Sequence, residues 1–385
     1  MNPPAPLRAF PPGGRDRARG PAKPVPRHVL LAVCLAGWLS GCASTDIGPG
    51  YYWQSVTGHL KLMHAARPVQ DWLADPATPP ALQQRLQLTQ RIRTFAVTEL
   101  HLPDNPSYRR YADLRRKAAV YNVVAAPALS LRLQQWCFPV AGCVGYRGYY
   151  DEAEARAFAA GLGNDLDVAV YPVPAYSTLG WMNWAGGDPL LNTFIGYPEG
   201  ELARLIFHEL AHQVVYAPGD TVFNESFATA VERLGGARWL AQADETARKS
   251  YDEFDGRRQA FRALTRATRD QLQTLYEDAS VDEATKRARK AELMQAFRES
   301  YSGLRQTWDG YKGYDAWVAQ ANNASFGAQA AYDQWVPAFE ALFEREGRDF
   351  TRFYDAVRTL ARQPATERQA ALQALDPTAR PPSTL

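Results

Sequence analysis

The sequence predicts an α+β fold that is mostly α-helical, with a small edge-type sheet and a predominantly helical C-terminal half. Apolar residues recur at three- and four-residue spacing over most of the chain, which is typical of amphipathic helices. One short β-branched run, residues 167–173, is bounded by Gly and Pro and predicts a strand. The 385 residues are 46% apolar and 22% charged, which is typical of a globular protein and excludes a disordered or collagen-like chain.

The elements are expected in the following order. From residue 51 to 132 the apolar spacing is helical, and Pro79 and Pro80 mark the start of the second helix. Residues 175–181 predict a second strand beside 167–173, and Pro172 and Pro174 would be tolerated best on an edge strand or at a bulge. Helices are then expected over residues 199–215, 224–241, 244–268, 282–301, 324–343 and 350–361. The two highly charged helices, 244–268 and 282–301, are interpreted as a solvated hairpin rather than a binding surface.

The N-terminal segment has the pattern of an export signal. Residues 1–41 carry six Lys or Arg against one acidic residue, and they include an apolar run, 29–38, that is too short to span a bilayer. The run ends at Leu39-Ser40-Gly41-Cys42, which resembles the bacterial lipobox, and this resemblance implies acylation of Cys42. The alternative is a Cys that merely ends a secretory signal. We expect a periplasm-facing lipoprotein of the bacterial cell envelope, and Ala43 after Cys42 is compatible with the outer membrane.

The rest of the chain gives no sign of nucleic-acid binding. Beyond residue 41 it has 37 basic and 40 acidic groups, a net charge of −3. Cys137 and Cys143 remain as a close pair, and in an exported chain such a pair predicts a disulfide. The competing interpretation, a metal-binding pair, lacks further ligands nearby.

Residues 208–212 carry the strongest chemical signal. They read His208-Glu209-Leu210-Ala211-His212, the H-E-x-x-H pattern of zinc peptidases, in a helical context. Residues four apart share one helix face, so both imidazoles can reach one Zn²⁺ ion. Glu209 would act as the general base toward water.

A catalytic zinc needs a third protein ligand. Glu225 and Glu232 compete, with 12 and 19 residues respectively between them and His212. If the helix of His212 ends one turn later and the next helix returns antiparallel, Glu225 lies level with His212 and Glu232 about 10 Å farther along. We therefore expect Glu225 to be the ligand. Glu232 is then either a hydrogen-bond partner of a ligand His or a surface acid, and Asp220 is expected to cap the second helix.

These residues resemble a known family. Phe223-Asn224-Glu225-Ser226-Phe227-Ala228 with Glu232 is similar to the N-E-G-F-A-x-x-x-E segment of gluzincin aminopeptidases, whose first Glu binds zinc. The chain from residue 50 also resembles a family of bacterial lipoproteins labelled as aminopeptidases. The matching stretches are 136–143, 146–149, 175–181, 206–213, 220–231, 322–324 and 336–339. The resemblance implies a zincin-like core, a zinc hydrolase and a peptide or protein substrate.

One departure from the gluzincin pattern concerns specificity. The strand before the zinc helix in gluzincin aminopeptidases lines the substrate and carries a Glu for its free amino terminus. The corresponding residues here, Ala175, Tyr176, Ser177 and Thr178, include no acid. An aminopeptidase remains the first expectation. A zinc endopeptidase and a non-catalytic, partner-binding envelope lipoprotein are the alternatives.

The oxyanion donor and the domain limits complete the expectations. Gluzincins use Tyr or His as this donor, and Tyr314 or Tyr332 are the favoured candidates here. The expected segments are a signal (1–41), a tether (42–50), a peptidase core with N-terminal helices (51–240), a helical subdomain (241–375) and a disordered tail (376–385).

Overall fold

The computed structural model describes residues 48–138, 142–175 and 177–376. The chain divides into Met1–Gly48 and Pro49–Leu385, and the description below concerns the second unit. The predicted signal, Cys42, Tyr176 and the tail beyond Asp376 lie outside the described residues.

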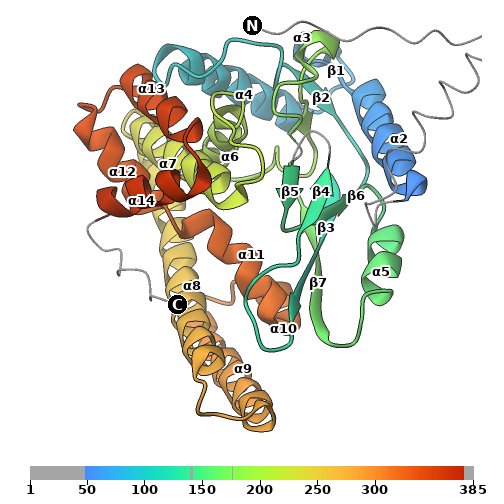
Figure 1. Ribbon diagram of the computed structural model, residues 1–385. Coiled ribbons are helices and arrows are strands. Elements are labelled where there is room, and N and C mark those ends of the chain that lie inside the picture. The colour runs from blue at the N-terminus through green and yellow to red at the C-terminus, as the bar shows by residue number, and fades with distance from the viewer. Residues whose placement is uncertain (1–47, 139–141, 176, 377–385) are drawn as a thin grey trace, which may run out of the picture. The chain divides into compact units, whose positions relative to one another are not determined.

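Helices make up most of this unit, so the mostly α prediction is confirmed (Figure 1). The helices are α2 (Pro49–Ala65), α3 (Val69–Ala74), α4 (Pro80–Thr98), α5 (Glu152–Ala160), α6 (Glu199–Ala211), α7 (Thr221–Leu240), α8 (Glu245–Glu277), α9 (Glu283–Gln306), α10 (Asp315–Gln320), α11 (Asn323–Asp333), α12 (Val336–Arg345), α13 (Phe350–Ala361) and α14 (Ala365–Leu375), with the 3-10 turn η2 (Asn183–Ala185). The strands are β1 (Arg67–Pro68), β2 (Arg110–Ala112), β3 (Val120–Pro127), β4 (Trp136–Phe138), β5 (Gly142–Val144), β6 (Arg147–Tyr149), β7 (Leu166–Val173) and β8 (Leu190–Leu191).

The strands form three small sheets. The largest has the order β6-β3-β7 with antiparallel pairing throughout, so β7, which contains Pro172, is an edge strand, one of the positions expected for that proline. A second sheet has the order β1-β2-β8, and β4 pairs with β5 as a hairpin. In that hairpin Cys137 lies opposite Cys143, and the two form the predicted disulfide.

Three predictions of secondary structure are wrong. Residues 51–132 are not helical throughout, because β2 and β3 lie within them. Residues 324–343 form two helices, α11 and α12, and Pro337 occupies the first turn of the second, where a missing N–H costs nothing. Residues 175–181 form no strand in their described part, for reasons given with the site below.

The core is built around α6 and α7. One hydrophobic cluster joins α4, α6, α7, α12 and α13, and it includes Phe207, Phe227, Phe339 and Phe353, all nearly inaccessible to solvent. Gly235 lets α7 approach its neighbours, because a Cβ there would lie 2.6 Å from Leu100 and 3.0 Å from Phe207. No helix in the described part of the chain is long and apolar enough to cross a bilayer.

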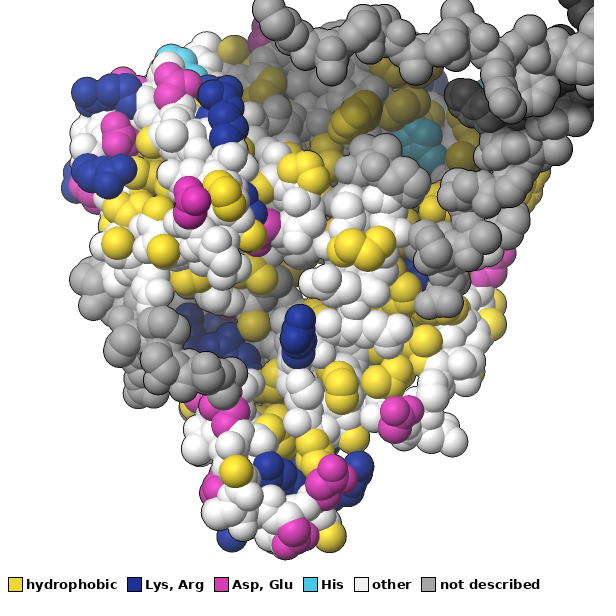
Figure 2. Space-filling view, viewed as in Figure 1, with side chains coloured by type: hydrophobic (Ala, Val, Ile, Leu, Met, Phe, Trp, Pro, Cys, Tyr) yellow, Lys and Arg dark blue, Asp and Glu magenta, His cyan; other side chains and the backbone are white. Residues whose placement is uncertain are grey.

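The long helices α8 and α9 form a hairpin that extends from this core (Figure 1). Acidic and basic side chains alternate over its tip, as Figure 2 shows. A smaller cluster, including Phe261, Phe297 and Trp308, holds the hairpin against α10. This arrangement agrees with the predicted solvated helical hairpin.

Candidate metal centre

Helix α6 presents His208, Glu209 and His212 to one cavity. Its opposite face carries Leu202, Ile206 and Leu210, which are fully buried in the core. The register of the helix is therefore fixed by core packing, and the one-turn spacing of the two His residues brings both to the other face. The α-helix ends at Ala211, with His212 as its C-cap residue.

The loop between α6 and α7 brings Glu225 back to these imidazoles. The Asn224 side chain accepts a hydrogen bond from the Ala217 N–H and donates one to the Ala217 carbonyl, each at 2.8 Å. Asp220 caps α7 by accepting from the Phe223 N–H at 3.0 Å, so the capping prediction is confirmed. The same carboxylate is held by Arg368 at 2.7 Å.

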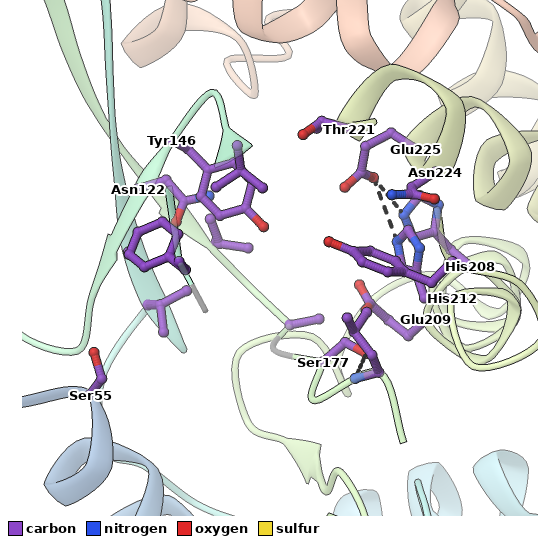
Figure 3. Close-up of a pocket in the computed structure, with 18 of the residues that line it drawn as sticks. Ser55, Asn122, Tyr146, Ser177, His208, Glu209, His212, Thr221, Asn224 and Glu225 are labelled. Carbon is purple, nitrogen blue, oxygen red and sulfur yellow. Dashed lines mark hydrogen bonds and ion pairs between the residues drawn. The ribbon is translucent and has the colours of Figure 1, made fainter. Parts of the chain in front are cut away.

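The three predicted ligands meet at one point (Figure 3). Glu225 Oε2 lies 3.2 Å from His208 Nε2 and 3.6 Å from His212 Nε2, and one donor atom from each side chain lies within 4.8 Å of the others. Bonds of about 2.0–2.1 Å to a tetrahedral ion would place donor atoms about 3.3 Å apart. Two imidazoles and one carboxylate at this spacing fit a zinc ion and could hold it.

Glu232 lies behind the candidate metal site. Its Oε2 is 3.1 Å from His208 Nδ1, the ring nitrogen that points away from Glu225. Its Oε1 is 2.5 Å from Arg204 Nη2, and the Arg204 side chain is only 3% exposed. Arg204 also reaches the Tyr251 hydroxyl at 3.0 Å and Asp255 at 3.5 Å, both on α8. Glu232 thus contacts His208, a candidate ligand, and Arg204 fixes Glu232.

Burial and charge set the protonation of this cluster. Burial raises the pKa of Glu225, but His212 and His208 outweigh it and lower that pKa to about 2. For Glu232 the penalty of burial is offset mainly by Arg204, and its pKa also falls to about 2. Burial raises the pKa of Glu209, against the opposing effect of the two His residues. A carboxylate with a raised pKa is suited to accepting a proton from water.

A cavity of about 340 Å³ opens over these residues. Figure 3 shows His208, Glu209, His212 and Glu225 on one side, with Asn122 and Tyr146 on the other. The sheet and the hairpin β4-β5 supply the second wall, and α2 contributes Tyr51 and Ser55.

The chain after β7 lines the cavity as a turn, which corrects the predicted strand. Leu179 and Gly180 have positive φ values of 54° and 78°, which a strand does not accommodate. The Thr178 N–H donates to the Asp188 carboxylate, at 3.1 and 3.0 Å from its two oxygens, and not to a strand partner. Ala175 and Ser177 do line the cavity.

Asp188 was not singled out as a site residue in the sequence. Its side chain is completely buried, and burial raises its pKa to about 6. Because it binds Thr178, it anchors the turn that faces Glu209. Its spacing in the sequence gives no signal of that role.

Tyr146 and Tyr332 are among the tyrosines that line the cavity at the candidate metal site. Tyr332 lines the cavity and stacks on His208, with ring centroids 6.2 Å apart. Tyr314 instead stacks on Phe261 at 4.0 Å, in the cluster beside the α8-α9 hairpin, and does not line the cavity. The nearby Glu225 carboxylate, together with burial, raises the pKa of Tyr332, so its hydroxyl keeps its proton. Tyr146 was missed as a site residue, although it lies in one of the stretches that resemble the family.

The disulfide hairpin supports the loop between α6 and α7. Gly142 packs so closely on that loop that a Cβ would lie 2.8 Å from the Gly219 backbone nitrogen. Both glycines have positive φ, 74° and 78°. The Cys137–Cys143 bridge therefore stabilises a wall that touches the loop leading into α7, the helix that carries Asn224 and Glu225.

The sequence model of a protein family described as "Putative aminopeptidase" matches residues 50–372. The chain belongs to this family. The match covers every described residue of the metal centre and the hairpin that supports it. Searches of curated proteins and of solved structures found no match to the chain.

Proposed function

We propose that the protein is a membrane-anchored, zinc-dependent peptidase, with aminopeptidase activity as the first expectation. The observation that carries this proposal is the convergence of His208, His212 and Glu225 beside Glu209 in one cavity. Three ligands leave a coordination position for water or substrate, whereas a purely structural zinc has four protein ligands. Membership of an aminopeptidase family supports the same reaction class.

A zinc ion held by these three side chains would supply Lewis acidity, which acidifies water and polarises a carbonyl group. Glu209 accepts the proton of the attacking water and delivers it to the leaving amine. The raised pKa of Glu209 makes its carboxylate a stronger acceptor of the proton of water. Tyr332, whose hydroxyl stays protonated, is the proposed donor to the developing oxyanion, in place of Tyr314.

Glu232 and Arg204 position the imidazole of His208. The Glu232 carboxylate at 3.1 Å favours a proton on His208 Nδ1, which leaves Nε2 free to bind a metal. We expect Glu225→Gln to lose zinc and Glu232→Gln to keep most of it. Zinc content after dialysis decides between them, and retention in Glu225→Gln with loss in Glu232→Gln would exchange their roles.

A zinc endopeptidase is the second candidate, and the cavity lining favours it. Among the described residues that line the cavity, the carboxylates are Glu209 and Glu225, both used in the proposed mechanism. Neither is left to pair with a substrate ammonium group. No Lys or Arg lines the described cavity to receive a terminal carboxylate. An internal peptide segment without terminal charges suits such a lining.

The test is digestion of a peptide library by the zinc-loaded protein. Half of the library has free amino termini and half is acetylated, and each half is run with and without a chelator. Cleavage of free termini one residue at a time supports the aminopeptidase. Cleavage of acetylated peptides at internal bonds supports the endopeptidase. Stoichiometric zinc with no cleavage in either half would favour the partner-binding lipoprotein.

A further inference from the structure

Helix α2 packs one face into the fold and leaves an apolar face open. At 100° per residue, Tyr51 and Ser55 point to one side of the helix, and Trp53, Val56 and Leu60 to the other. The first side packs into the fold and lines the cavity. The second side is open: Trp53 is 72% exposed, Val56 55% and Leu60 57%.

This outer face is unusual for a helix at a protein surface. An amphipathic surface helix normally turns polar side chains outward, and one that is apolar all round is normally covered. Seven large hydrophobic side chains are exposed in the described chain, and four of them belong to α2 when Tyr52 is included. Singly scattered apolar residues need no explanation, but a stripe at helical spacing indicates a contact surface.

The outer face of α2 carries no negative charge that would repel an anionic membrane surface. No Asp or Glu occurs from residue 47 to 70, whereas Lys61 is exposed beside the apolar stripe. Trp and Tyr with neighbouring cationic side chains are the composition that binds at the headgroup boundary of a bilayer.

The predicted anchor brings lipid within reach of this face. Six residues separate Cys42 from Pro49, where α2 begins. Seven extended residue steps span at most about 25 Å. An acylated Cys42 therefore holds the first turn of α2 close to the membrane surface.

We propose that the outer face of α2, formed by Trp53, Val56 and Leu60, docks onto the bilayer that holds the acyl chains of Cys42. The helix lies in the plane of the headgroups and does not span the membrane. This inference rests on the anchored part of the proposed function and is independent of zinc and of catalysis.

Docking fixes the orientation of the cavity. Tyr51 and Ser55 line it from the inner face of the same helix, so the cavity lies about one helix diameter, roughly 10 Å, from the lipid surface. Figure 1 shows α2 at the periphery of the fold. The substrates reached most easily are peptide segments at the membrane surface.

The experiment measures tryptophan quenching by lipid. The full chain is produced with its own signal and purified from membranes, and the mass of its N-terminal peptide establishes whether Cys42 is acylated. It is then reconstituted in phosphatidylcholine–phosphatidylglycerol vesicles, with or without brominated phosphatidylcholine. Emission is compared for the native protein, Trp53→Phe and the control Trp184→Phe. Trp184 is 83% exposed but lies on η2 and not on α2.

We expect Trp53→Phe to lose at least half of the lipid-dependent quenching and Trp184→Phe to retain it. A double variant, Val56→Gln with Leu60→Gln, keeps Trp53 as the reporter and should lose quenching at least twofold while remaining on the vesicles. Equal quenching in the native protein and both α2 variants would overturn the proposal. So would a chain whose Cys42 carries no lipid. Because the readout needs no turnover, failure of the peptidase would leave the result interpretable.

Discussion

Replacement of Arg204 by Met tests the charge network behind the metal site. Arg204 is 3% exposed, and its guanidinium lies 2.5 Å from Glu232, which lies 3.1 Å from His208 Nδ1. The variant leaves Glu232 buried without the cation that does most to hold its pKa at about 2. Removing one partner of a buried ion pair costs about 3–5 kcal/mol of unfolding free energy. Disturbing the partner of a metal-binding His lowers metal affinity roughly 10- to 100-fold.

The assay is urea unfolding of the zinc-free protein, combined with zinc competition against a chromophoric chelator. Arg233→Met is the matched control, because Arg233 pairs with Glu340 at 3.1 Å but is 45% exposed. A surface pair contributes about 1 kcal/mol or less, and zinc affinity should not change. Equal effects of the two variants on stability and on zinc binding would refute the reasoning.

Three further outcomes are expected. Replacing Cys137 and Cys143 together by Ser should lower the unfolding free energy by about 2 kcal/mol, measured by urea denaturation under oxidising conditions, and an unchanged midpoint would count against the bridge. Burial raises the pKa of Asp188 to about 6, so the native state binds more protons than the unfolded state between pH 4 and 6, and native stability falls as pH rises through that range. Asp188→Asn removes this pH dependence. The free energy of unfolding of the variant, minus that of the native protein, should therefore rise by roughly 3 kcal/mol from pH 4 to pH 7, and a difference that does not change with pH would contradict the assignment. Tyr332→Phe should lower kcat on the order of 10²-fold while Tyr314→Phe leaves it unchanged, and the reverse order would restore Tyr314 as the oxyanion donor.

The helical part of the fold could be predicted because its periodicity is unambiguous. Residues 350–361 were expected to be helical, and α13 has the same bounds. The hairpin argument that favoured Glu225 over Glu232 requires only helix rise and a short loop, and in the structure Glu225 faces His208 Nε2 while Glu232 faces His208 Nδ1. Local rules were sufficient there, because both ligand-bearing segments are helices joined by one loop.

The strand region could not be predicted as well, because its signals are short and depend on distant partners. Strand β3 pairs with β7 across a long stretch of chain, and apolar residues nearby imitate helical spacing. Residues 175–181 contain β-formers, but the buried Asp188 takes the Thr178 N–H that a strand partner would need. The place of Tyr146 in the cavity likewise depends on tertiary packing, which no local pattern encodes.

The most direct measurement of the central claim is zinc content and peptide hydrolysis on the same sample of Glu209→Gln. Glu209 is the proposed base and not a ligand. The variant should therefore retain one zinc per chain while its kcat falls on the order of 10²-fold or more below that of the native protein. Hydrolysis at the native rate by the zinc-loaded variant, or loss of the metal together with activity, would contradict the assignment of Glu209 as the base beside a site formed by His208, His212 and Glu225.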